Sequence, residues 1–365
     1  MSLLEVIDLK VSFNTSDGVV QAVRGITFNV DSGRTLGIVG ESGSGKSVAT
    51  QTLLGLTPGA RVSGTALFEG QDLLKMDGDQ LRRVRGKQIG MIFQDPLSSL
   101  HPLYRVGWQI MEMIRTHEPE VTKAEARKRT IELLGIVGIP QANQRVDDFP
   151  HQFSGGMRQR AMIAMALALN PKLIVADEPT TALDATVQAQ ILDLMSRLQR
   201  EFDTALIMIT HDLGVIADIA DDVLVMYAGK PVEQTDRRSL YYRPHHPYAK
   251  GLLESIPGST GAKGRLKPIP GQPPSLINVP TGCSFHPRCA YVMDRCITDE
   301  PPLRPVGAAT EGAGHDSACW LPEAALGLGS DAEQLRAKAV GEGRVGAAKQ
   351  LAARISSDVK GTVAR

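Results

Sequence analysis

The stretch TLGIVGESGSGKS, residues 35–47, decides the fold of this chain. Its first residues form an apolar run typical of a buried strand. Its last eight, Gly40–Ser47, fit the pattern G-x-x-x-x-G-K-[ST], and the following residues SVATQTLLGL have the character of a helix. A strand, a glycine-rich loop and a helix in this order are the context that the pattern requires. We therefore predict that the chain binds a nucleotide, rather than carrying a chance glycine turn.

The residues of this loop explain the prediction chemically. Gly40, Gly43 and Gly45 allow consecutive backbone N–H groups to converge on phosphate oxygens, assisted by the N-terminus of the following helix. Lys46 can reach the β- and γ-phosphates, and the Ser47 hydroxyl can ligate Mg²⁺.

The sequence around the loop predicts an α/β fold with a mainly parallel central sheet. Short apolar runs alternate with helical stretches over most of the first 226 residues. The clearest of these runs are 35–39, 88–93, 173–176, 205–209 and 223–226. The N-terminal runs 4–11, 22–30 and 64–68 are separated by turns and predict an antiparallel sheet. Residues 96–165 are mainly helical and predict a subdomain inserted into the α/β core.

A second acidic motif, LIVADEP at residues 173–179, ends a buried strand in two carboxylates. We expect Asp177 to lie near the Mg²⁺ of the glycine-rich loop. Glu178 is then positioned to polarise a water for attack on the γ-phosphorus. An acidic strand end without chemistry is the alternative, and the presence of a phosphate-binding loop argues against it.

Composition restricts the remaining classes of function. Of the 365 residues, 40 Lys and Arg balance 40 Asp and Glu, which argues against an affinity for nucleic acid based on a global basic field. The longest apolar run, 161–169, is far shorter than the roughly 18–20 residues that span a bilayer. Glu5 and Asp8 lie where a signal peptide would be basic and then apolar. We therefore expect a cytosolic chain that reaches a membrane only through a partner.

The four cysteines all lie near the C-terminal end of the sequence, at positions 283, 289, 296 and 319. They follow a proline- and glycine-rich stretch, residues 256–280, which predicts an extended linker. In a reducing cytosol such a cluster indicates metal ligation more often than disulfides. Zinc ribbons usually contain tight C-x2-C pairs, which are absent here, whereas an iron–sulfur cube accepts cysteines from varied spacings. Zinc and free thiols remain the alternatives.

The segment FSGGMRQR, residues 153–160, completes a set of motifs. With the two motifs above it resembles the ATP-binding subunits of ABC transporters, over about residues 3–248. Met157 stands where most members have Gln, a departure common in the peptide-transporter branch. Ser154, followed by Gly155 and Gly156, would begin a helix whose amides and positive dipole end face an anion.

The resemblance implies a role for further residues. Gln94 would contact Mg²⁺ and the attacking water, His211 would contact the γ-phosphate, and Asp184 would cross to an opposing subunit. Phe13 would stack on adenine, although a core phenylalanine is an equal alternative. The implied catalytic residues are Glu178, His211 and Gln94, and the implied Mg²⁺ ligands are Ser47, Gln94 and Asp177. The implied nucleotide contacts are Phe13, Gly40, Ser42, Gly43, Gly45, Lys46, Ser47, Ser154, Gly155, Gly156 and Asp184.

The resemblance also implies domains, partners and a location. Residues 1–245 would form the ATPase domain, residues 246–325 a C-terminal extension with the four cysteines, and residues 326–365 a tail that is a weak helix or disordered. Two ATPase subunits would sandwich each ATP and drive two membrane-spanning permeases, supplied by an extracytoplasmic substrate-binding protein, at the cytoplasmic face of the membrane.

The C-terminal extension is similar to that of dipeptide and oligopeptide transporter ATPases, which can hold a [4Fe–4S] cluster on Cys283, Cys289, Cys296 and Cys319. The expected cargo is therefore a peptide. A nickel or oligosaccharide importer, a soluble ABC ATPase acting on DNA or ribosomes, and a degenerate nucleotide-binding regulator are the alternatives.

Overall fold

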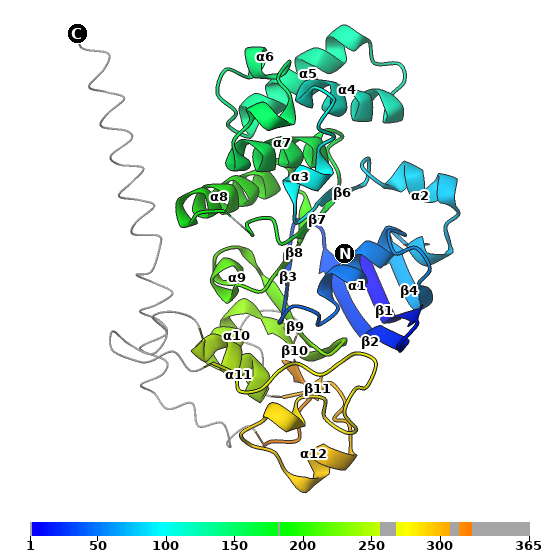
Figure 1. The fold of residues 1–365 in the computed structure, drawn as a ribbon, viewed down its shortest axis with the longest axis vertical. Coiled ribbons are helices and arrows are strands. Elements are labelled where there is room, and N and C mark those ends of the chain that lie inside the picture. The colour runs from blue at the N-terminus through cyan, green and yellow to red at the C-terminus, as the bar shows by residue number, and fades with distance from the viewer. Residues whose placement is uncertain (1, 182, 256–267, 307–313, 323–365) are drawn as a thin grey trace, which may run out of the picture. The chain divides into compact units, whose positions relative to one another are not determined.

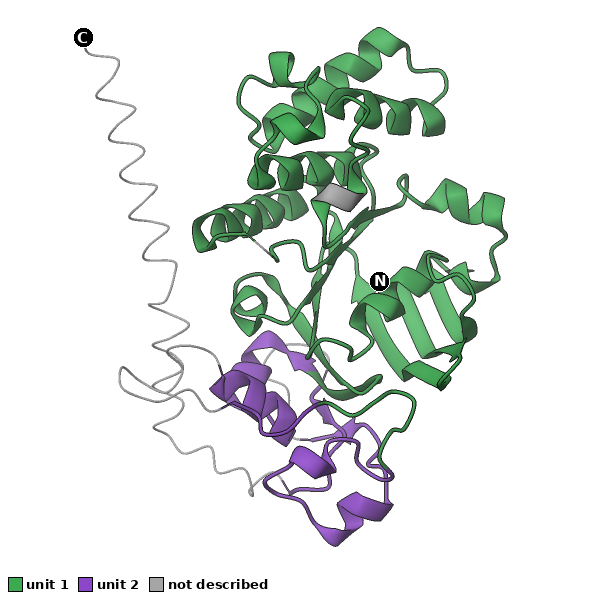
Figure 2. Cartoon of the chain, viewed as in Figure 1, with its two compact units in different colours: residues 1–234, 273–280 green, residues 235–272, 281–365 purple. Residues whose placement is uncertain are grey.

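The computed structural model of this protein describes residues 2–181, 183–255, 268–306 and 314–322. The chain divides into two compact units, residues 1–234 with 273–280 and residues 235–272 with 281–365 (Figure 2). The expectation for the tail, residues 326–365, lies outside the described residues.

The centre of the first unit is a mainly parallel sheet with the strand order β10-β9-β3-β8-β7-β6 (Figure 1). Its strands are β3 (Thr35–Val39), β6 (Ile89–Ile92), β7 (Leu173–Asp177), β8 (Ala205–Thr210), β9 (Asp222–Tyr227) and β10 (Lys230–Asp236). β3 pairs in parallel with β8 and β9, and β7 pairs in parallel with β6 and β8. Every residue of β3, β7 and β8 is buried, as expected for strands covered on both faces. The predicted α/β fold is confirmed.

The N-terminal strands form a separate antiparallel sheet with the order β2-β1-β4-β5. These strands are β1 (Ser2–Thr15), β2 (Gly18–Asp31), β4 (Arg61–Phe68) and β5 (Gln71–Asp72). Their apolar side chains, among them Leu4, Ile26 and Phe68, join those of helix α1 (Lys46–Leu53) and of β3 in one hydrophobic core. This shared core holds the glycine-rich loop, between β3 and α1, at the junction of the two sheets.

Several helices lie between β6 and β7 in the chain. They are α3 (Pro96–Ser99), α4 (Val106–His117), α5 (Lys123–Ile136), α6 (Ala142–Arg145) and α7 (Gly155–Leu167). α5 begins with a capping box, in which Thr122 accepts from the Glu125 amide and Glu125 accepts from the Thr122 amide. α2 (Gly78–Val84) precedes β6, while α8 (Ala185–Phe202) and α9 (Leu213–Ile219) follow β7 and β8. The helical character predicted for this part of the chain is confirmed.

The second unit contains short elements. They are α10 (Arg237–Tyr242), α11 (Pro247–Glu254), α12 (Asp294–Thr298) and the paired strands β11 (Arg304–Pro305) and β12 (Asp316–Ser317). The predicted linker is described only from residue 268, and residues 268–280 contain neither helix nor strand. Within the part of the chain that the structure describes, no helix combines the length and apolar character needed to cross a membrane.

Candidate active site

Two glycines of the loop after β3 could not be any other residue. A Cβ on Gly40 would lie 2.2 Å from the Met226 carbonyl oxygen, and a Cβ on Gly45 would lie 2.2 Å from that of Ala22. Both residues also have positive φ angles, of 154° and 97°. The loop is therefore pressed against the neighbouring strands β9 and β2. Gly43 differs, because a Cβ there meets nothing within 4 Å, and both it and Ser42 are exposed on the open side of the loop.

Lys46 reaches back across the loop. Its Nζ donates to the carbonyl oxygens of Gly40, at 2.7 Å, and Glu41, at 2.9 Å. The side chain is buried, and burial lowers the pKa of its ammonium group, although the nearby carboxylates of Glu178, Asp177 and Glu41 oppose that effect. A buried ammonium group held by the carbonyl oxygens of a glycine-rich loop is suited to an anionic ligand.

Ser47 and Asp177 form the second part of the site. The Ser47 Oγ donates to Asp177 Oδ1 at 2.7 Å, and Gln51 Nε2 donates to Asp177 Oδ2 at 3.3 Å. Burial and the neighbouring Glu178 carboxylate raise the pKa of Asp177, against the lowering effect of these hydrogen bonds. Gln51 was not predicted from the sequence, although it lies one helical turn after Ser47 on the same face of α1.

A hydroxyl and a carboxylate in contact fit a magnesium ion, which prefers hard oxygen ligands. The predicted Mg²⁺ ligands Ser47 and Asp177 are thus brought together. Gln94, the third predicted ligand, donates through its amide nitrogen to Glu178, so its amide oxygen is the atom with which it could ligate a metal.

Glu178 is the centre of a hydrogen-bonded cluster. Its Oε2 accepts from Gln94 Nε2 and from Thr181 Oγ1, each at 2.9 Å, and its Oε1 lies 3.1 Å from His211 Nδ1. Gln94 follows β6, Glu178 and Thr181 follow β7, and His211 follows β8. The ends of three adjacent parallel strands therefore bring the predicted catalytic residues together. Thr181 was missed, and its position three residues after Glu178 in a turn was the available signal.

Both the backbone and the ionisation of Glu178 suit a base. Its φ of +47° is unusual for a residue with a side chain, and its amide donates to the Ile209 carbonyl at 2.9 Å. Burial is the largest single effect and would raise its pKa, but the hydrogen bonds from His211 and Thr181, together with the charges of His211 and Lys46, bring the pKa below its ordinary value. Its carboxylate is therefore ionised at neutral pH.

The segment Ser154–Gly156 begins α7. Ser154 Oγ accepts from the Met157 amide at 3.3 Å and caps the helix. Ser154 and Gly155 are exposed, and a Cβ on Gly155 would meet nothing within 4 Å, whereas a Cβ on Gly156 would lie 2.9 Å from Val187 Cγ1. Close packing on α8 therefore explains why residue 156 is a glycine. The same reason does not apply to the glycine at position 155.

Asp184 and Phe13 lie on other elements. Asp184 caps α8, with its Oδ1 accepting from the amides of Thr186, at 3.1 Å, and Val187, at 3.0 Å. Phe13 lies on β1, half-buried against the core that the two sheets share. Its predicted stacking on adenine stays a prediction.

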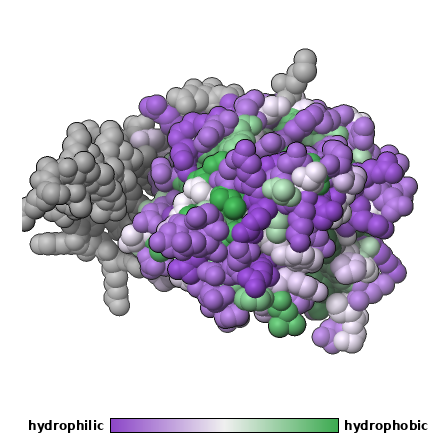
Figure 3. Space-filling view, turned by 90° about the horizontal axis from the view of Figure 1, so that it is seen from above, coloured by the Kyte–Doolittle hydropathy of each residue, from purple (hydrophilic) through white to green (hydrophobic). Residues whose placement is uncertain are grey.

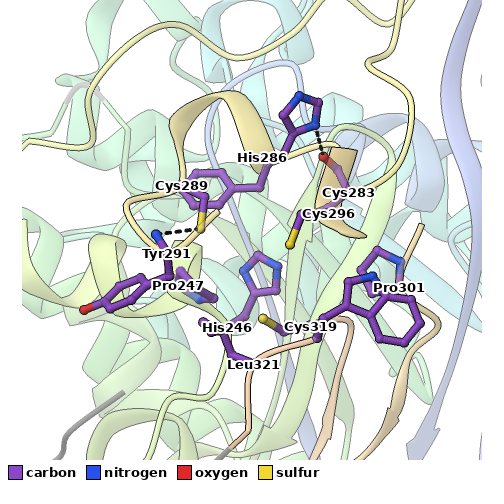
Figure 4. Close-up of a pocket in the computed structure, with 12 residues that line it drawn as sticks. His246, Pro247, Cys283, His286, Cys289, Tyr291, Cys296, Pro301, Cys319 and Leu321 are labelled. Atoms are coloured by element: carbon purple, nitrogen blue, oxygen red, sulfur yellow. Dashed lines mark hydrogen bonds between the residues drawn. The ribbon is translucent and has the colours of Figure 1, made fainter. Parts of the chain in front are cut away.

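The four cysteines line one cavity of the second unit, together with His246, Phe285 and Tyr291 (Figure 4). Cys296 and Cys319 are buried, and Cys283 and Cys289 partly so. Burial raises the pKa of the Cys283 thiol to about 11 and that of Cys319 to about 12. Among the described residues, no three His, Cys, Asp or Glu side chains form a group that could hold a metal ion. The four cysteines expected as ligands therefore line the same cavity, but their side chains do not come together as a metal-binding group.

The fold and the site together define a P-loop ATPase of the ATP-binding-cassette class. The combination is a glycine-rich loop after a buried strand, an acidic strand end hydrogen-bonded to it, and a serine-capped helix that begins with two glycines.

Comparisons with known proteins agree with this class. The model of the ABC transporter family matches residues 23–181, and that of the oligopeptide/dipeptide transporter C-terminal region matches residues 232–296. The chain is 54% identical to the oligopeptide transport ATP-binding protein OppD of Bacillus subtilis, over 82% of this chain and 85% of that protein. It is 47% identical to the dipeptide transport ATP-binding protein DppD of the same organism, over 88% of this chain and 95% of that protein. The chain belongs to the ABC transporter ATP-binding proteins, in the branch that carries the oligopeptide/dipeptide C-terminal region.

Two solved structures are similar to the chain as well. One is the dimeric, post-hydrolysis state of the ATP-binding cassette MJ0796 bound to ADP and Pi, with a TM-score of 0.59 and 26% identity over 64% of this chain and 99% of that chain. The other is cbiO1 from Clostridium perfringens, part of the ABC transporter complex cbiONQ, with a TM-score of 0.56 and 29% identity over 66% of this chain and 90% of that chain.

Proposed function

We propose that this chain is the ATP-hydrolysing subunit that energises an ABC importer of di- or oligopeptides. The observation that carries the proposal is the Glu178 carboxylate, bound by side chains that follow three adjacent strands and next in sequence to the carboxylate that Ser47 contacts. The names of the relatives, oligopeptide and dipeptide transport ATP-binding proteins, support the choice of cargo.

The residues of the chain divide the work of hydrolysis. The loop amides of residues 40–47 and the Lys46 ammonium bind the phosphates. Ser47 and Asp177, with Gln94, would hold Mg²⁺, which would neutralise charge on the phosphates. Glu178, which is ionised, accepts a proton from the attacking water as the water oxygen bonds to the γ-phosphorus, while the bond from this phosphorus to the bridging oxygen breaks and ADP leaves. Gln94 orients that water.

A second cassette completes the site. The amides at the start of α7 and the open side of Gly155 form a surface that suits an anion. Packing within the chain does not account for the glycine at position 155, so we assign this surface to ATP held by a companion subunit. The dimeric state of the related cassette MJ0796 supports this arrangement. Asp184, at the start of α8, is assigned to the same contact between subunits.

The proposed partners are two permease subunits and, through them, an extracytoplasmic substrate-binding protein. The chain after Gln94 offers an apolar surface, since Leu103, Tyr104 and Trp108 are 77%, 46% and 39% exposed. Figure 3 shows the molecule from above the view of Figure 1, and that face is mostly hydrophilic, with a few separate hydrophobic patches. We propose that a permease helix covers these side chains at the cytoplasmic face of the membrane. With no net charge, the chain is not proposed to bind nucleic acid.

We also propose that the cysteine cavity holds a [4Fe–4S] cluster. A cube distributes its four cysteines over four irons, so the thiols need to share a cavity rather than meet at one point. The cavity lined by Cys283, Cys289, Cys296 and Cys319 supports this proposal. Residues 1–245 are proposed as the ATPase domain, with residues 96–165 as its helical subdomain, residues 246–325 as the cysteine-bearing extension and residues 326–365 as its tail.

Glu178→Gln tests the proposed function. The variant should bind ATP as the native protein does and hydrolyse it about 10²–10⁴-fold more slowly, because an amide cannot accept the proton. Glu69→Gln, on an exposed ion pair with Lys172, is the control and should keep full activity. Hydrolysis by the native complex with its permeases should be stimulated by peptides and not by nickel or oligosaccharides. Undiminished turnover in Glu178→Gln would exclude Glu178 as the base.

A further inference from the structure

We infer that Thr181 is a positioning residue for Glu178, whose hydroxyl keeps one carboxylate oxygen aimed at the attacking water when Gln94 moves away. The inference rests on the proposed function, in which Glu178 is the base. The motifs of the sequence do not include Thr181 among the residues of the site.

Both oxygens of the Glu178 carboxylate are held in this structure. Oε1 faces His211 Nδ1 at 3.1 Å, and Oε2 accepts from both Gln94 and Thr181. A carboxylate oxygen can accept two hydrogen bonds, so the donors to Oε2 fix the orientation of the carboxylate while Oε1 keeps an acceptor position for the attacking water. Of the two donors to Oε2, Gln94 is the one suited to leave, because its side chain is exposed and it follows β6, whereas Glu178 follows β7.

Thr181 cannot leave in the same way. It belongs to the same turn as Glu178, and its amide donates to the Glu178 carbonyl at 3.1 Å. The Thr181 hydroxyl and the Glu178 carboxylate are therefore three residues apart in a turn whose backbone is already closed by its own hydrogen bond. The hydroxyl stays within reach of Oε2 whatever the loop after β6 does.

Glu178 has a particular need of such a donor. Its φ of +47° turns the backbone at the end of β7, and a glutamate side chain has three rotatable bonds beyond that point. His211 restrains only one oxygen, and its side chain is 55% exposed. Without Thr181, release of Gln94 would leave the carboxylate free to rotate about the contact with His211.

A purely structural role for Thr181 is the competing explanation. Closure of the turn uses the amide of Thr181, whereas the hydroxyl bonds to the carboxylate. Removing the hydroxyl while the amide keeps the turn closed should therefore lower kcat without lowering thermal stability, whereas opening the turn would lower both.

The experiment compares Thr181→Val, which removes the hydroxyl with little change in shape, and Thr181→Ser, which keeps it. ATP hydrolysis by the complete complex is measured as kcat and KM for ATP, with thermal unfolding of each variant. We expect kcat to fall about tenfold in Thr181→Val, with KM for ATP unchanged. The melting temperature of Thr181→Val should stay close to that of the native protein, because the amide of Thr181 still closes the turn. Thr181→Ser should restore kcat.

Thr15→Val is the control, because the Thr15 hydroxyl donates to the Gly18 carbonyl in an exposed turn of the other sheet. A native kcat in Thr181→Val would overturn the inference, as would a Thr181→Ser variant impaired as severely as Thr181→Val. The two proposals fail differently. If Glu178→Gln is inactive and Thr181→Val is native, only the inference about Thr181 fails, whereas a fully active Glu178→Gln removes the proposed base itself.

Discussion

The Ser47 hydroxyl donates a 2.7 Å hydrogen bond to Asp177, although the two residues are 130 positions apart in the sequence. Ser47 begins α1, directly after the loop that follows β3, and Asp177 ends β7. One strand, β8, lies between β3 and β7 in the sheet. Because these strands are parallel, their carboxyl ends meet at one edge, and the residues that follow them form a single site.

The burial of the Asp177 carboxylate lowers the stability of the folded protein at neutral pH. Its pKa is raised in the folded protein, chiefly by burial, so the folded state binds a proton more tightly than the unfolded state does. Stability is therefore lost as pH rises from the unfolded value of about 3.9 through the folded pKa. We expect Asp177→Asn to raise the melting temperature of the nucleotide-free protein at pH 7 by a few degrees, with a smaller gain in acid, and to abolish Mg²⁺-dependent hydrolysis.

Thermal unfolding at several pH values measures this effect. Asp79→Asn, an exposed carboxylate on α2, is the matched control and should change little. A lower melting temperature for Asp177→Asn at pH 7 would contradict the prediction.

The two glycines at the start of α7 should respond differently to alanine. Both substitutions should stabilise the helix by at most about 1 kcal/mol, because alanine has a higher helix propensity than glycine. Only the new methyl group of Gly156→Ala would contact Val187, and such overpacking lowers the stability by about 1–3 kcal/mol. We expect Gly156→Ala to unfold at a lower temperature than Gly155→Ala, and Val187→Ala to reduce that difference. Gly155→Ala should instead lose hydrolysis while its fold is intact, because its open face is assigned to the companion's ATP.

Melting temperatures and ATPase rates of the single and double variants test this pair. Equal stability of the two alanine variants would show that Val187 gives way without cost. Full activity of Gly155→Ala would remove Gly155 from the contact between subunits.

Asp184 caps helix α8 and is also assigned to the contact between subunits. Two substitutions of Asp184 distinguish these two roles. Asp184→Ala removes the acceptor for the Thr186 and Val187 amides and should cost about 1 kcal/mol. Asp184→Asn keeps an acceptor and should keep the stability while losing the charge. Denaturant unfolding and ATPase rates measure the two effects, and an equal loss of stability in both variants would contradict this division.

Because the four cysteines line one cavity, we expect the purified protein to contain iron. Protein purified without oxygen should be brown and contain iron and sulfide, and each of the four Cys→Ser variants should lose most of both. His286→Asn is the control, because His286 lines the same cavity but its Nδ1 lies 2.9 Å from the Cys283 carbonyl oxygen. Stoichiometric zinc without visible absorption would replace the cluster assignment.

Much of this site was predictable because its parts are local. Lys46 bonds to carbonyls five and six residues away, and Ser154 and Asp184 cap the helices that they begin. Such contacts depend on the backbone geometry of a few consecutive residues, which residue types at fixed spacing encode. The strand positions followed in the same way from short apolar runs.

The sequence by itself thus determined the phosphate loop, the strands, the helix starts and the identity of the acidic pair. Only the tertiary structure decided that Gln94, 84 positions from Glu178, and His211, 33 positions from it, hold the same carboxylate, with Thr181 as a third donor. It alone also placed the four cysteines around one cavity. The physical reason is that the order of strands in a sheet and the packing of irregular loops depend on contacts between distant residues, which no local pattern of residue types specifies.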